Sequence, residues 1–174
     1  MRDALGYLAD ELVCVVTVGG SGVGSSLLHR VVDAFPAAKR ALPSLRMIVV
    51  AGPRIDPACF RAREGLEVRS YVHELYRHLA VCDLAVVQGG LTTCMELTAA
   101  QRPFLYVPLH NHFEQTFHVP HRLARYRAGH RLAPDVSSEE IAEAIVHHIG
   151  EVPGSLPVAG DGARCAARLL ADLL

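Results

Sequence analysis

Short hydrophobic runs rich in β-branched residues recur along the chain, each bounded by glycine, proline or polar residues. The clearest lie at residues 13–18, 47–51, 84–87 and 104–107. Because both faces of each run are apolar, the pattern favours buried parallel strands over half-exposed antiparallel ones. We therefore predict a strand at each of these positions.

Segments with helical periodicity separate and follow these runs. They are residues 25–41, 73–81, 91–101, 113–126 and 137–148. Strands that alternate with helices at this spacing predict right-handed βαβ units, and hence an α/β fold with a doubly wound, mostly parallel, Rossmann-like sheet flanked by helices.

The two ends of the chain carry weaker signals. Residues 2–11 suggest a short helix that leads directly into the first strand, and a Gly/Pro-rich loop at 150–162 precedes an amphipathic helix at 163–174. We therefore expect one domain spanning residues 1–174, with its core in residues 1–150.

Composition narrows the function classes. The chain has 174 residues, 51% of them hydrophobic, which is enough to form a core that is stable without disulfide bonds or a structural metal. Its 17 basic and 18 acidic residues give a net charge of −1, so no overall field attracts nucleic acid or an anionic membrane. No run approaches the ~18 apolar residues of a membrane-spanning helix, and no signal peptide is evident. A site that binds phosphate must therefore depend on a few groups close to it and not on the net charge of the protein.

The cysteines are odd in number and scattered, and none forms a CxxC pair. They are Cys14, Cys59, Cys82, Cys94 and Cys165. This pattern argues against a disulfide framework and against a zinc knuckle, and we expect a reducing, cytoplasmic compartment.

A Gly-rich segment, residues 19–24, follows the first predicted strand and opens a helix. Its backbone could approach a diphosphate closely, although a flexible turn would have the same composition. A P-loop requires Lys after Gly24, where this chain has Ser25. A dinucleotide fingerprint requires Gly at position 25 and an acid after the second strand, where Ala51, Gly52 and Pro53 stand instead, so NAD is not expected.

A second Gly-rich segment, residues 88–96, runs from the third strand into a helix. Thr92 or Thr93 could cap this helix and also donate to a phosphate. Glu96 follows Thr93 by three residues, so it could be the acid of a capping box or a ligand-binding group. The spacing alone leaves both roles open.

A polar loop, residues 108–115, follows the fourth strand. Glu114 and Gln115 offer acceptors and donors that suit vicinal sugar hydroxyls. Histidines gather in and after this loop: His110, His112, His118 and His121. Because no carboxylate and thiolate partners are arranged around them as in a zinc ligand set, we predict no metal here.

These three segments, in this order, resemble the C-terminal domain of the two-domain GT-B glycosyltransferases, especially family 28 and the related family 1. The resemblance covers residues 2–150 and is strongest in GGLTTCMELTAAQRPFLYVPLHNHFEQ, residues 89–115. Family 1 enzymes usually have His where this chain has Gln88, so family 28 is the closer relative.

The resemblance implies roles for individual residues. Gly20, Ser21, Gly22, Gly89, Gly90, Thr92 and Thr93 would surround the diphosphate, Glu96 the ribose, His112, Glu114 and Gln115 the sugar, and the backbone at Tyr71 and Val72 the uracil. His110 or His112 could act near the leaving group, while the general base would come from the N-terminal domain that such enzymes carry.

The implied function is that of the donor-binding domain of an inverting, metal-independent glycosyltransferase. It would transfer a hexose or N-acetylhexosamine from a UDP-sugar, without a further cofactor, to an unknown acceptor. The chain resembles either an excised domain, favoured by the helix expected at 2–11, or one subunit of a split enzyme, and self-association through the cleft face is a related expectation. The alternatives are a non-catalytic UDP-sugar-binding or regulatory subunit and an epimerase-like domain specific for UDP-N-acetylglucosamine.

Overall fold

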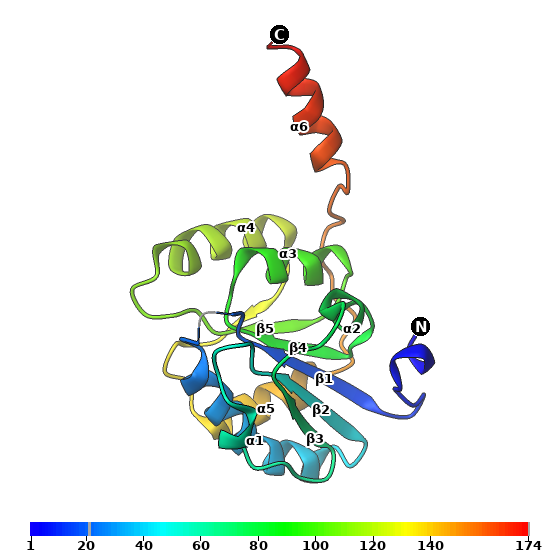
Figure 1. Ribbon diagram of the computed structural model, residues 1–174, viewed down its shortest axis with the longest axis vertical. Coiled ribbons are helices and arrows are strands. Elements are labelled where there is room, and N and C mark those ends of the chain that lie inside the picture. Colours follow the sequence, from blue (N-terminus) through cyan, green and yellow to red (C-terminus); the bar gives the residue numbers. More distant parts are fainter. Residues whose placement is uncertain (21, 174) are drawn as a thin grey trace.

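The computed structural model describes residues 1–20 and 22–173 and contains a six-stranded sheet in which all neighbouring strands pair in parallel (Figure 1). The strands are β1 (Leu12–Thr17), β2 (Leu45–Val50), β3 (Leu66–Arg69), β4 (Leu84–Val87), β5 (Phe104–Tyr106) and β6 (His130–Arg131). Their order, β3-β2-β1-β4-β5-β6, is that of the doubly wound nucleotide-binding folds. The predicted α/β class is confirmed.

Helices cover both faces of the sheet, as Figure 1 shows. On one face lie α1 (Ser25–Ala41) and α5 (Ser138–His148), which pack against each other, and on the other lie α2 (Leu75–Val81), α3 (Leu91–Ala99) and α4 (Val119–Tyr126). The bounds of α1 agree with the predicted segment. In the segment predicted as one helix at 113–126, a π-helical turn at Glu114–His118 precedes α4.

The core consists of two apolar layers separated by the sheet. Successive side chains of a strand point to opposite faces. In β1, Val16 therefore packs in the layer with Leu28 of α1, whereas Val15 packs in the layer with Leu97 of α3. This arrangement explains why β1 is apolar at every position but its last, Thr17, and why β4 is apolar throughout.

The beginning of the chain differs from the prediction. Only Asp3–Leu5 is helical, as a 3-10 turn, because Gly6 has the left-handed φ of 76° that ends it. The segment is held to the sheet by Asp83, whose Oδ2 lies 2.9 Å from Arg2 Nη1. The same oxygen accepts a 2.7 Å hydrogen bond from the N–H of Val13. The expected helix at 2–11 is wrong.

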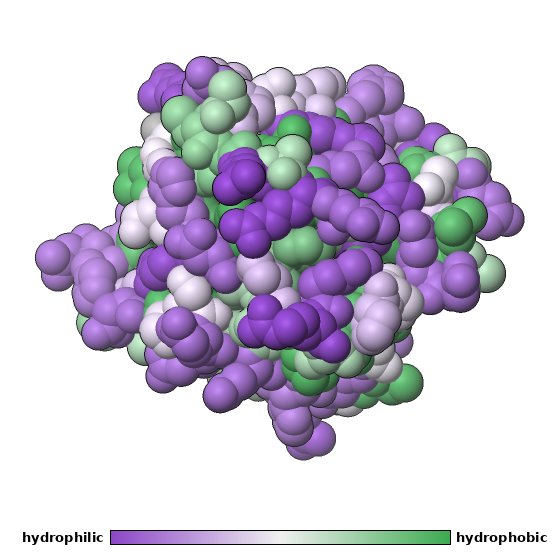
Figure 2. Space-filling view, turned by 90° about the horizontal axis from the view of Figure 1, so that it is seen from below, coloured by the Kyte–Doolittle hydropathy of each residue, from purple (hydrophilic) through white to green (hydrophobic). Residues whose placement is uncertain are grey.

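The last helix, α6 (Gly162–Ala171), extends away from the sheet and its helices (Figure 1). It buries none of its own side chains, and Leu169 and Leu170 are exposed. The side of the molecule opposite α6 is mostly hydrophilic, with hydrophobic residues in small separate areas (Figure 2). Within residues 1–20 and 22–173, no helix combines the length and the apolar character needed to cross a membrane.

Candidate functional site

The loops that follow β1 and β4 meet at the carboxyl edge of the sheet, where parallel sheets bind ligands. Gly24 lies at the point of contact. A Cβ atom at this position would be 2.2 Å from Cβ of Val18 and 2.4 Å from Oε1 of Gln88. Only glycine fits, so the Gly-rich loop is packed against the end of β4.

The loop after β2 joins the same edge. Gly52 has a left-handed φ of 83°, and a Cβ atom there would lie 2.5 Å from the carbonyl oxygen of Gly19. The backbones of two neighbouring loops therefore approach more closely than any side chain would permit. The glycines after β1 are held between the loops that follow β2 and β4.

The loop after β5 is ordered by Gln115. Its Oε1 accepts a 2.9 Å hydrogen bond from the N–H of Leu109, and its own N–H donates to His112 Nδ1 at 3.4 Å. The same Oε1 lies 4.0 Å from the position that a Cβ of Gly89 would occupy. Gln115 thus connects the loop after β5 with the one after β4, while Glu114 is exposed.

The start of α3 differs from the expected capping arrangement. The N-cap is Gly90, and no side chain caps the helix. Thr92 and Thr93 are instead its second and third residues, so Thr93 cannot form a capping box with Glu96. The cap and capping-box expectations are wrong because Gly90 already takes the extended conformation of an N-cap, with φ −67° and ψ 134°. The N–H groups of the first turn, the Thr92 hydroxyl and the exposed Glu96 lie at this end of the helix.

A pocket of about 230 Å³ lies beneath these loops. It is lined by Val23, Ser26, Leu27, Arg30, Gln88, Val107, Pro108, Leu109, His110 and Pro134. The pocket joins residues of α1 with the ends of β4 and β5. Two candidates for phosphate contact, Ser26 and Arg30, were missed from the sequence, although their four-residue spacing places them on one face of α1.

Arg30 is positioned by backbone carbonyls. Its Nη1 donates to the carbonyl oxygens of Pro134 at 3.0 Å and Val136 at 2.7 Å. The guanidinium therefore fastens the segment after β6 to α1. It also places a permanent positive charge in the wall of the pocket.

The other residues expected at the site share its edge of the sheet but do not line this pocket. Gly20 and Gly22 lie in the loop after β1, and Ser21 lies outside the described residues. Tyr71 and Val72 follow β3, a strand that the sequence did not predict. Tyr71 is 72% exposed and Val72 only 8%, so Val72 can offer a ligand its backbone but little of its side chain.

A larger hollow of about 990 Å³ lies elsewhere, over α1 and α5. Its lining includes Ala37, Ala41, Glu143 and His147. Since Ala41 ends α1, this hollow is near the amino edge of the sheet, away from the strand ends that carry the glycines.

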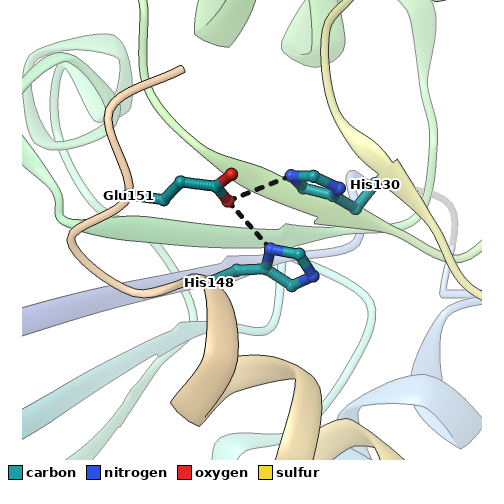
Figure 3. Close-up of side chains that lie close together, drawn as sticks. All are labelled: His130, His148 and Glu151. Atoms are coloured by element: carbon teal, nitrogen blue, oxygen red, sulfur yellow. Dashed lines mark hydrogen bonds and ion pairs between the residues drawn. The ribbon is translucent and has the colours of Figure 1, made fainter. Parts of the chain in front are cut away.

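Potential metal ligands also gather away from the loop histidines. Within the described part of the chain, three such residues bring their ligand atoms close together: His130, His148 and Glu151 (Figure 3). The sequence interpretation considered only the histidines at 110–121. The signal it missed was His147 and His148 followed closely by Glu151.

All five cysteines are free, and burial raises the pKa of Cys82 and of Cys94 to about 12.

The sequence is similar to those of known glycosyltransferases. An uncharacterized glycosyltransferase of Methanopyrus kandleri is 30% identical over the whole of this chain, which spans 49% of that protein. The UDP-N-acetylglucosamine–N-acetylmuramyl-(pentapeptide) pyrophosphoryl-undecaprenol N-acetylglucosamine transferase of Rubrobacter xylanophilus is 23% identical over 77% of this chain and 39% of its own length. This chain thus spans about half of the one relative and less of the other.

Among solved structures, the UDP-GlcNAc 2-epimerase of Methanocaldococcus jannaschii, in complex with UDP-GlcNAc and UDP, has the same fold. Its TM-score is 0.71 at 11% identity, over 98% of this chain and 48% of that one. The family model described as the glycosyltransferase family 28 C-terminal domain matches residues 13–147. That match contains the sheet except for the first residue of β1, and α1 to α5 except for the last residue of α5, and the chain therefore belongs to the C-terminal domain family of the family 28 glycosyltransferases.

Proposed function

We propose that this chain is the donor-binding domain of an inverting glycosyltransferase and holds a UDP-hexose or UDP-N-acetylhexosamine. The observation that carries the proposal is the contact of Gly24 with Gln88, which joins the loops after β1 and β4 at the centre of the sheet. Strand order reverses between these two strands, and such a switch point is where nucleotides bind in doubly wound folds.

The diphosphate would lie at the start of α3. The helix begins without a side-chain cap, so the N–H groups of its first turn can donate to phosphate oxygens. Thr92 and Thr93 would add hydroxyl donors, and the Gly-rich loop would cover the other side. Glu96, one turn further along, would accept hydrogen bonds from the ribose hydroxyls.

The reaction would be a direct displacement at the anomeric carbon. As the bond to the donor phosphate breaks, negative charge grows on the departing UDP, and the partial positive charge of the α3 N-terminus would stabilise it without a metal ion. His110 lines the pocket beneath the loops and would shield this charge. The general base that deprotonates the acceptor would come from outside this domain.

Exposed apolar side chains at the carboxyl edge support the need for a second domain or subunit. Val23, Tyr71, Phe113 and Phe117 are between 57% and 72% exposed, and all belong to segments that follow β1, β3 or β5. Apolar residues gathered on one edge are typical of a surface that another protein unit covers. An acceptor-binding domain, or a partner that supplies one, would contact this edge.

The experiment that tests donor binding is calorimetry of UDP with the Glu96→Ala variant. A hydrogen bond from a charged carboxylate to the ribose contributes about 1.5–3 kcal/mol, so the dissociation constant should rise about ten- to a hundredfold. Glu143→Ala, an exposed glutamate of α5 beside the distant hollow, is the matched control and should leave it unchanged. Equal UDP affinity in the parent and the folded Glu96→Ala variant would refute the role of Glu96.

The alternative functions differ in turnover and not in UDP binding. A regulatory subunit would bind UDP-sugar but would not support transfer when the completing N-terminal half is supplied. A 2-epimerase-like enzyme would isomerise UDP-N-acetylglucosamine without any acceptor. Product analysis after mixing this chain with that half, with and without acceptor, separates the three activities.

A further inference from the structure

A compact group of ionisable side chains lies at the edge of the sheet opposite the candidate donor site. His130 begins β6, His148 ends α5, and Glu151 follows within three residues, so the group is at the amino edge of the sheet (Figure 3). It connects a strand, a helix and the segment that leads towards α6. Nothing in the proposed donor chemistry uses these residues.

The geometry of the group suits a single ion. Glu151 Oε2 lies 3.2 Å from His130 Nε2 and 2.8 Å from His148 Nδ1, and the three ligand atoms lie within 4.8 Å of one another. Bond lengths of about 2.0–2.2 Å place neighbouring ligand atoms of a tetrahedral zinc ion roughly 3.3 Å apart. The two distances from Glu151 Oε2 are already close to that spacing, so side-chain rotations would bring the three atoms around one centre.

The chemistry of the three side chains points to the same ligand class. Two imidazoles and one carboxylate form a ligand set that zinc accepts. The negative end of the α5 dipole also favours a cation beside His148.

There is room for a fourth ligand. A pocket of about 80 Å³ borders His130 and Glu151 and is also lined by Arg102, Arg127 and Ser155. The buried Oγ of Ser155 has no hydrogen-bond partner within residues 1–20 and 22–173. Water or a small anion bound to the ion could bond to this hydroxyl, and the arginines would favour the anion.

We propose that His130, His148 and Glu151 form a structural site for a divalent metal ion of the kind that imidazole and carboxylate ligands bind, such as Zn²⁺. The bound ion would fasten the start of the C-terminal segment to β6 and α5. That segment is otherwise held by a few hydrogen bonds, such as those from Gly150 N–H to the Asp83 carbonyl at 3.0 Å and from Leu156 N–H to the Tyr126 carbonyl at 2.8 Å. The ion would thereby fix the direction in which α6 leaves the domain.

The test is calorimetric titration of Zn²⁺ into the full 174-residue chain near neutral pH. The exposed thiols are removed by Cys59→Ser and Cys165→Ser, so that they cannot compete for the ion. We expect saturable binding of one zinc ion per chain. His130→Ala and His148→Ala should each weaken binding about tenfold or more.

Two further variants keep the result interpretable. His121→Ala removes an exposed imidazole of α4 outside the group and should leave zinc binding unchanged. Glu151→Gln changes one exposed side chain, so the metal-free fold should persist by circular dichroism while zinc affinity falls. Absence of saturable one-to-one binding in the parent, or equal affinity in His148→Ala, overturns the site.

Discussion

At the scale of single residues, a buried polar pair ties the beginning of the chain to α2. The Tyr7 hydroxyl and His78 Nδ1 share a hydrogen bond, with the two residues 1% and 8% exposed. Burial raises the pKa of Tyr7 to about 12. Burial and the positive charge of Arg69 lower the pKa of His78. Both groups are therefore held neutral in the folded protein.

The lowered pKa of His78 predicts a pH dependence of stability. In the unfolded chain His78 takes up a proton near its ordinary pKa of 6.5, whereas the folded protein resists protonation until a lower pH. The unfolded state then binds more protons, so the free energy of unfolding should fall as the pH drops below 6.5. The same sign applies to His130, whose pKa is also lowered.

Replacing His78 isolates its share of this effect. His78→Asn keeps a polar group near the Tyr7 hydroxyl but removes the titration, so its stability should decline less steeply with acid than that of the parent. Urea unfolding at several pH values between about 8 and 5.5 measures the slope, whose origin is differential proton binding. An identical slope in both proteins would contradict the assignment.

At the scale of the elements, α5 begins with signals that the sequence displays. Ser137 Oγ accepts a 3.2 Å hydrogen bond from the N–H of Glu140, and Ser137 N–H donates to Glu140 Oε2 at 2.8 Å. These two bonds form a capping box. Local chemistry therefore fixes where this helix starts, in agreement with the segment predicted from residue 137.

Loss of the cap should have a moderate cost. Ser137→Ala removes the acceptor for the Glu140 N–H and should lower the free energy of unfolding by about 1 kcal/mol. Ser138→Ala, at the first helical position, is the control and should change it little. Chemical denaturation of both variants is the measurement, and equal stabilities would exclude a contribution from the cap.

The elements that the sequence did not reveal lie at the two sides of the sheet. β3 has the sequence LEVR, which alternates apolar and polar residues, and β6 has only two residues. Each pairs with one neighbour, β2 or β5. A run that is apolar on both faces predicts a strand buried within the sheet, so this pattern does not reveal a short or alternating strand at its edge.

At the scale of the whole molecule, the C-terminal segment divides into a docked and an undocked part. Leu156 N–H donates to the Tyr126 carbonyl at 2.8 Å, and Gln101 Nε2 donates to the Ser155 carbonyl at 3.3 Å. Beyond these contacts α6 buries none of its own side chains. Residues 157–174 should therefore contribute little to the stability of the domain.

Two truncations test this division. A chain that ends at Leu156 should keep its free energy of unfolding within about 0.5 kcal/mol of the parent, since residues 157–173 are exposed except for the half-buried Val158. A chain that ends at Gly150 also loses the contacts to Tyr126 and Gln101 and should be measurably less stable. Denaturant unfolding compares the three, and a large loss of stability in the chain that ends at Leu156 would show that residues 157–174 support the domain.

The sequence by itself determined the layers of this protein and the order of its central elements, because apolar periodicity and helix-start signals act over a few residues. It also placed the glycines and threonines that belong to the candidate donor site. Only the tertiary structure decided the edge strands, the absence of a threonine cap on α3 and the meeting of His130, His148 and Glu151. The edge strands and the meeting of the three ionisable side chains depend on contacts between segments far apart in the chain, which no local pattern encodes, whereas the start of α3 depends on the extended conformation of Gly90.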